Sequence, residues 1–196
     1  MDLYYKKIEK FNSRTDYNED IKHANLLLNY CILNSKKRNI FFIGTGLGGD
    51  IEIVRGLKNL EITGIEPRKS FQEEVEKVYK KINGKLLKMN LGEFTKTSKS
   101  LSGIFFFIHS INHIPKNQIN LFQKAIKNSY IIIINPNPEI EKVVGKVDNT
   151  VISYLDSKII QKSLNCKIIF DYFYNLVELR KKDIFLREAI VLKTKN

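Results

Sequence analysis

The sequence predicts an α/β fold in which a mostly parallel sheet is covered by helices on both faces. Short apolar runs alternate with helix-length segments from about residue 39 onward, which is the pattern of βαβ units. The last third instead carries two β-rich runs, Lys167 to Leu179 and Asp183 to Lys193, joined by three basic residues. No helix fits into so short a connection, so one of these two strands is expected to run antiparallel to the rest.

The individual elements follow from hydrophobic periodicity and from glycine and polar breaks. Residues 1–38 are expected to form an N-terminal helical segment, because apolar residues recur every three or four positions from Ala24 to Ile32. Asp16 or Asn18 is predicted to cap that helix. Residues 39–196 are expected to form the α/β core of the same single domain. Five further strands are predicted at 39–43, 61–65, 85–89, 103–108 and 130–134, and four helices at about 50–58, 70–82, 117–128 and 156–164.

Composition narrows the function classes. The hydrophobic share of 43% and the charged share of 28% are typical of soluble globular proteins, and no apolar run approaches the roughly 18 residues of a membrane span. The first residues lack the apolar stretch of a secretory signal, so we expect a cytoplasmic protein. Cys31 and Cys166 lack the paired spacing of a disulfide framework or a zinc site. The net charge of +12 comes from scattered lysines, so a nucleic-acid partner is possible but not favoured.

A glycine-rich segment between a predicted strand and a predicted helix is the strongest local signal. It reads Gly44-Thr45-Gly46-Leu47-Gly48-Gly49, and the first, third and last positions match the G-x-G-x-x-G spacing. Glycines at such a turn let a nucleotide-like ligand approach the main chain, while a helix N-terminus offers free N–H groups. An ordinary glycine-rich loop is the simpler alternative.

A carboxylate completes the pattern. Glu66 ends the next predicted strand, 22 residues after Gly44. At that distance a carboxylate can accept hydrogen bonds from the ribose hydroxyls of an adenosine-containing ligand. The two features together predict an adenosine site, with a solvated glutamate at a strand end as the alternative.

In these features the chain, from Asn39 to its C-terminus, resembles the class I S-adenosylmethionine-dependent methyltransferases. The first family motif is similar to Ile40 to Gly48, and the segment from Gly103 to Pro115 looks like the fourth strand and the loop that lines the methyl-transfer site. The resemblance implies a Rossmann-like three-layer sandwich whose seven-stranded sheet ends in an antiparallel strand. It also implies S-adenosylmethionine as the cofactor, bound by Gly44, Thr45, Gly46, Gly48, Glu66, Pro67, Asn90, Leu91 and His109.

Methyl transfer requires mainly that the protein align the acceptor with the methyl group and exclude water, because the donor is already activated. A base is needed only when the acceptor must lose a proton. His109 and His113 flank the loop after the predicted fourth strand and are the candidates for that role. A small-molecule acceptor is favoured because the sequence leaves no room for a separate substrate-recognition domain.

One departure from the family pattern keeps other functions open. Many members carry an acidic residue two positions before the first glycine, near the methionine ammonium, and this chain has Phe42 there. The alternatives are an RNA or protein methyltransferase, which the charge would suit, an aminopropyltransferase-like enzyme, an NAD-dependent oxidoreductase with the same glycine loop, and a non-catalytic adenosine-binding module.

Overall fold

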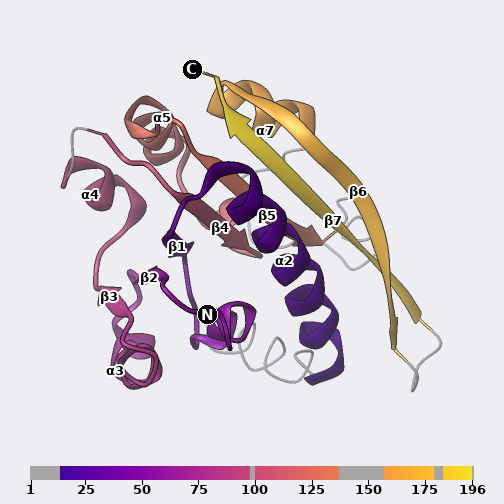
Figure 1. Cartoon of the computed structure of the whole chain (residues 1–196), viewed down its shortest axis with the longest axis horizontal. Coiled ribbons are helices and arrows are strands. Elements are labelled where there is room, and N and C mark those ends of the chain that lie inside the picture. Colours follow the sequence, from indigo (N-terminus) through magenta and orange to yellow (C-terminus); the bar gives the residue numbers. More distant parts are fainter. Residues whose placement is uncertain (1–13, 98–99, 137–156, 179–182, 196) are drawn as a thin grey trace.

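A seven-stranded sheet with the order β3-β2-β1-β4-β5-β7-β6 forms the centre of the computed structural model (Figure 1). The structure describes residues 14–97, 100–136, 157–178 and 183–195. Strands β1 to β5 pair in parallel, whereas β7 pairs antiparallel with both β5 and β6. The expected mostly parallel sheet with an antiparallel C-terminal strand is therefore confirmed. The strands are β1 Asn39–Ile43, β2 Glu61–Ile65, β3 Lys85–Leu87, β4 Ile104–Ile108, β5 Tyr130–Pro136, β6 Cys166–Glu178 and β7 Asp183–Thr194.

The strand order reverses its direction once within this sheet. From β1 the chain moves outward to β2 and β3, and then returns to the other side of β1 to form β4. The direction of winding reverses between β1 and β4, and in open α/β sheets ligands bind beyond the carboxyl ends of the strands at such a reversal. The loops after β1 and β4 are therefore the first place to look for a site.

Helices cover both faces of the sheet. Helix α2 (Arg14–Ser35), the 3-10 helix η1 (Gly49–Val54) and α3 (Lys69–Lys80) pack on one face, and Figure 1 shows α2 crossing it. Helices α4 (Leu91–Lys96), α5 (Lys116–Ala125) and α7 (Ser157–Leu164) pack on the other. Each face has its own apolar cluster, because successive strand residues point to opposite sides of the sheet.

The two central strands are the most deeply buried elements. Residues 104–107 of β4 and 130–135 of β5 are all buried, which explains why they read as uninterrupted apolar runs instead of an alternating pattern. Cys31 and Cys166 are free and buried, and burial raises the pKa of both thiols to about 12. Within the described ranges, none of the helices has the length and apolar character that a membrane crossing requires.

Several sequence predictions need correction. Helix α2 already begins at Arg14, so Asp16 and Asn18 lie within it and the predicted cap at either residue is wrong. The helix predicted over 50–58 is a short 3-10 helix that ends at Val54, two residues before Gly56 adopts a φ of 81°. Helix α4 was not predicted, because its six residues are too few to show a helical period.

Candidate functional site

The loop after β1 turns sharply at its first glycine. Gly44 has a φ of 72°, in the left-handed region that disfavours residues with a Cβ atom. Its N–H donates to the carbonyl oxygen of Ile65 at 2.8 Å, which holds the loop against the end of β2. A Cβ atom at position 44 would lie 2.9 Å from the Cβ of Ser110, in the loop after β4. Glycine is therefore required twice here, for the turn and for close approach of the two loops.

The predicted carboxylate lies directly against this loop. Glu66 follows β2, and one of its oxygens, Oε2, accepts a hydrogen bond from the Gly46 N–H at 2.8 Å. The other, Oε1, accepts from the Arg68 N–H at 2.9 Å, and the residue is only 2% exposed. Each carboxylate oxygen has a second lone pair with which to accept from a ligand hydroxyl. The two features that the sequence predicts to form one site are thus in contact.

Besides Asp50 Oδ1, which directly follows the glycine loop, four buried side-chain oxygens at the same edge have no hydrogen-bond partner among the residues that the structure describes. They come from the loop after β1, the loop after β4 and the end of β5. Buried polar groups are nearly always hydrogen-bonded, so a group of orphaned ones at one edge fits a polar ligand bound there. The atoms are Thr45 Oγ1, Ser110 Oγ, Asn112 Oδ1 and Asn135 Oδ1.

Asn90 is the N-cap of α4, a role that was not predicted from the sequence. It caps α4 through a capping box: its Oδ1 accepts from the Glu93 N–H at 2.9 Å, and its own N–H donates to Glu93 Oε2 at 2.8 Å. An Asn followed three residues later by Glu is the signal that would have revealed this short helix. The capping box uses the Asn90 side-chain oxygen, and the amide nitrogen, Nδ2, has no hydrogen-bond partner among the described residues.

The remaining predicted cofactor residues differ in how they are placed. Gly48 is buried, and a Cβ atom there would be in ordinary van der Waals contact with Val75 and Val78 of α3. Leu91 is buried in the apolar cluster beneath α4 and α5. Pro67 is exposed beside Glu66.

His109 is held in an unusual conformation immediately after β4. Its φ is 51°, and its N–H donates to the carbonyl oxygen of Ile134 at 2.8 Å. Its ring nitrogen Nε2 lies 2.8 Å from Oδ2 of Asp20, a carboxylate of α2 that is 2% exposed. Burial by itself would raise the pKa of Asp20, but the hydrogen bond and charge of His109, with the nearby Arg187, outweigh it and lower the pKa below its ordinary value.

His113 makes no hydrogen bond with this pair of residues in the described part of the chain. It ends the short 3-10 helix η2 (Ile111–His113), and its side chain reaches the surface. Partial desolvation lowers the pKa of His113, and the positive charges of Arg68 and His109 act in the same direction. The neutral imidazole is therefore favoured, but no described residue orients it as Asp20 orients His109.

Phe42 takes part in the core, and a different acid lies close to the glycine loop. Phe42 is buried and stacks on Phe106, with ring centroids 5.0 Å apart. Asp50, directly after the loop, is buried and accepts a hydrogen bond from the Tyr79 hydroxyl at 3.5 Å. Burial raises the pKa of Asp50 to about 8, with a further contribution from the negative charge of Glu66. Asp50 is thus a largely neutral acid at the base of the loop at pH 7.

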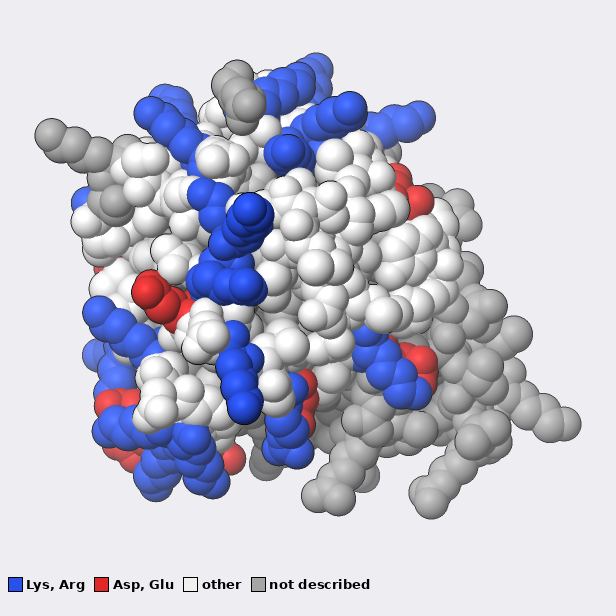
Figure 2. All heavy atoms as spheres, viewed as in Figure 1, with Lys and Arg blue, Asp and Glu red and all other residues white. Residues whose placement is uncertain are grey.

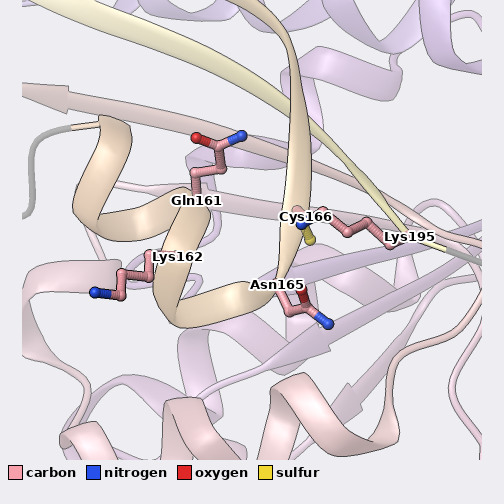
Figure 3. Close-up of a pocket in the computed structure, with 5 residues that line it drawn as sticks. All are labelled: Gln161, Lys162, Asn165, Cys166 and Lys195. Carbon is pink, nitrogen blue, oxygen red and sulfur yellow. The ribbon is translucent and has the colours of Figure 1, made fainter.

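A polar pocket of about 270 Å³ lies at the opposite edge of the sheet (Figure 3). It surrounds the start of β6 and the end of β7, where the parallel strands begin. It therefore shares no residue with the glycine loop or Glu66. Its lining residues are Gln161, Lys162, Asn165, Cys166 and Lys195.

No protein-family model matches the sequence, and neither does any curated protein. Solved structures do match. A SAM-dependent methyltransferase from Archaeoglobus fulgidus is 17% identical with a TM-score of 0.70, over 97% of this chain and 99% of that one. An S-adenosylmethionine-dependent methyltransferase from Clostridium acetobutylicum is 10% identical with a TM-score of 0.68, over 99% and 100%.

A third structure was solved with ligands. The plantazolicin methyltransferase BpumL, in complex with a monoazolic desmethylPZN analog and SAH, is 19% identical with a TM-score of 0.67, over 99% of this chain and 91% of that one. The chain therefore has the Rossmann-like fold of the S-adenosylmethionine-dependent methyltransferases. This confirms, at the level of the fold, the resemblance that the sequence motifs carry.

Proposed function

We propose that this protein is an enzyme that transfers the methyl group of S-adenosylmethionine to a small-molecule acceptor. The observation that carries the proposal is the contact between the Gly46 N–H and the Glu66 carboxylate at the strand-order reversal. It brings a main-chain turn together with a carboxylate that could accept from ribose hydroxyls, at the edge where α/β folds of this kind bind nucleotides. The fold shared with methyltransferases supports the choice of cofactor.

The residues at this edge suit the parts of the cofactor. Glu66 would accept from the ribose hydroxyls, Asn90 Nδ2 and the main chain of Leu91 would face the adenine, and the turn at Gly44 would let the ligand approach the backbone. The unpartnered oxygens of Thr45 and Ser110 would serve the charged methionine end. When bound, S-adenosylmethionine supplies an activated methyl group on its sulfonium. The protein aligns the acceptor with that methyl group and excludes water.

A small acceptor is favoured by the neighbour of similar length. BpumL matches over 91% of its own chain and was solved with a desmethylPZN analog. By analogy, the acceptor here would bind within this fold, over the loop after β4.

Calorimetry tests the cofactor. We expect S-adenosylhomocysteine to bind and NAD to bind much more weakly. Replacing Glu66 with Gln removes a charged acceptor and turns an amide donor toward a main-chain N–H. A hydrogen bond to a charged group contributes roughly 1.5–3 kcal/mol, so the affinity for S-adenosylhomocysteine should fall about 10- to 100-fold. Glu74→Gln, on the exposed surface of α3, is the matched control and should bind as the wild type does.

Other outcomes would favour other functions. Tighter binding of NAD would overturn the assignment in favour of an oxidoreductase, and failure to bind any adenosine ligand would favour a non-catalytic module.

An RNA or protein methyltransferase is the second candidate, because of the net charge of +12. Figure 2 shows Lys and Arg side chains spread over much of the visible face, separated by uncharged surface. Affinity for a phosphate backbone falls steeply with salt when several lysines release counterions. RNA binding that weakens between 50 and 200 mM salt, on the order of 10³-fold, would support this candidate, and no measurable RNA binding at low salt would remove it.

A further inference from the structure

A buried cluster of polar side chains joins α2 to the sheet beside the proposed site. Asp20 of α2 lies at its centre: one oxygen, Oδ2, contacts His109 Nε2 at 2.8 Å and Arg187 Nε at 3.5 Å. The other, Oδ1, accepts a hydrogen bond from the Tyr174 hydroxyl. His23, one turn further along α2, stacks on the Tyr174 ring with centroids 3.8 Å apart. The cluster thus draws on α2, the loop after β4, and both strands of the C-terminal hairpin.

The contact with Asp20 uses only one of the two ring nitrogens of His109. Nε2 faces the carboxylate, so in the neutral ring the proton sits on Nε2 and is donated to Asp20. Nδ1 has no hydrogen-bond partner in the described part of the chain, and the side chain is 30% exposed. A ring fixed in this way presents a bare lone pair on Nδ1, which is the requirement for a general base.

The position of His109 relative to the proposed cofactor site follows from its neighbour. The loops after β1 and β4 meet at Gly44 and Ser110, where a Cβ atom added to Gly44 would lie 2.9 Å from the Ser110 Cβ. His109 is therefore one residue away from this contact. Its left-handed backbone, with φ at 51°, is kept in place by the hydrogen bond to Ile134 and by Asp20. A non-glycine residue in this conformation costs free energy and persists where its surroundings enforce it, commonly at functional sites.

We infer that Asp20 is a positioning residue that aims His109 at the methyl acceptor, and that the accepting atom is therefore an oxygen or nitrogen that carries a proton. This inference rests on the proposed function. The acceptor's X–H bond breaks, and its proton goes to His109 Nδ1. The freed electron pair of X forms the bond to the methyl carbon as the carbon–sulfur bond of the donor breaks, and that pair stays on sulfur. His109 then releases the proton to water. Acceptors without such a proton, such as thioethers and tertiary amines, need no base. With such an acceptor the contact between Asp20 and His109 would have no role in the reaction.

A purely structural alternative is that the cluster only fastens α2 to the sheet. Both explanations predict that loss of Asp20 destabilises the fold, so stability does not separate them. They differ in the state of the His109 ring, and in whether that ring senses a ligand in the cofactor site.

Nitrogen NMR of the histidine rings makes the distinction. The chain has three histidines, so ¹⁵N-histidine labelling gives three pairs of ring signals, which His109→Gln and His113→Gln assign. We expect neutral His109 to carry its proton on Nε2 and to have an unprotonated Nδ1. Saturation with S-adenosylhomocysteine should shift the His109 Nδ1 signal more than either nitrogen of His23. A proton on Nδ1, or a His109 ring that does not respond to bound S-adenosylhomocysteine, would overturn the inference.

Two variants of Asp20 test the positioning role. Asp20→Asn keeps an oxygen that can accept from Nε2–H, so His109 should retain its Nε2–H form. Asp20→Leu removes the acceptor and should give a mixture of the two neutral forms, with circular dichroism used to check that the variant is folded. If Asp20→Leu is folded and the His109 signals are unchanged, Asp20 does not position the ring. If it does not fold, the wild-type ring state and its response to S-adenosylhomocysteine still decide.

The failure of this inference is distinguishable from failure of the proposed function. Calorimetry with S-adenosylhomocysteine is done first: no binding refutes the proposed function itself. With binding established, and with S-adenosylmethionine at concentrations that saturate each protein, His109→Gln should abolish transfer of a labelled methyl group to a panel of phenols, alcohols, amines and thioethers. Label on oxygen or nitrogen that is lost in His109→Gln supports the inference, and label accepted by a thioether sulfur overturns it.

Discussion

The first glycine of the loop after β1 offers a sharp test of how the two central loops meet. At Gly44 an added methyl group faces two obstacles, a left-handed φ of 72° and the Ser110 Cβ at 2.9 Å. At Gly46 the φ is 56°, but nothing lies within 4 Å of an added Cβ. Gly46→Ala therefore measures the backbone cost alone. Gly44→Ala adds the steric clash, so the pair separates the two effects within one loop.

The expected magnitudes follow from these two geometries. A left-handed conformation costs an alanine roughly 1–2 kcal/mol, partly offset by about 0.4–1 kcal/mol from the stiffer unfolded chain. Gly46→Ala should therefore destabilise the fold by about 1 kcal/mol. Overpacking of a tight contact costs typically 1–3 kcal/mol more. Gly44→Ala should then lose about 2–4 kcal/mol in all.

Urea unfolding followed by circular dichroism measures both changes. With a slope of about 2 kcal/mol per M, the midpoint of Gly44→Ala should fall by about 1–2 M and that of Gly46→Ala by about 0.5 M. Ser110→Gly removes the clashing Cβ, so in a double-mutant cycle it should recover much of the extra loss in Gly44→Ala. Equal midpoints for the two alanine variants, or no coupling to position 110, would refute the close approach of these loops.

Three further predictions concern the core and the buried acid. Phe106→Ala empties a side chain that is 1% exposed and should cost about 3–5 kcal/mol in urea unfolding, whereas Phe173→Ala, at a residue 55% exposed, should stay within about 0.5 kcal/mol. Gly103→Ala places a Cβ 2.6 Å from the carbonyl oxygen of the neighbouring strand, which cannot swing away as a side chain could, so a loss of about 1–3 kcal/mol is expected by the same assay. The pKa of Asp50 is raised to about 8 in the folded protein. Between about pH 4 and pH 8 the unfolded chain has therefore lost the Asp50 proton while the folded chain keeps it. The free energy of unfolding should fall as the pH rises, by up to about 1.4 kcal/mol per pH unit. Asp50→Asn should remove this slope; a difference between wild type and variant that does not change with pH would contradict the raised pKa.

Much of the site could be predicted because its signals are local. A glycine run between an apolar strand and a helix, and an acid at the next strand end, each follow from backbone geometry at that point in the chain. The structure then showed Glu66 against Gly46, since the carboxyl ends of neighbouring parallel strands meet at one edge. The capping box at Asn90 was equally local and was missed because a helix of six residues leaves no periodic pattern.

The partner of His109 could not be predicted from the sequence. Asp20 lies 89 residues earlier in the chain, on a helix whose remaining pattern only indicates packing, and nothing in its neighbours distinguishes it from other acidic residues. Tyr174 and Arg187 join it only because β6 and β7 pair side by side, next to β5.

By itself, then, the sequence determined the class of fold, the antiparallel hairpin and the glycine loop with its carboxylate, because periodicity and turn chemistry act between residues a few positions apart. Only the tertiary structure decided which side chains meet across the sheet: the buried acid under the loop, the unpartnered oxygens at its edge, and the carboxylate that orients His109. Such contacts depend on strand order and helix packing, which bring together residues that carry no information about one another along the chain.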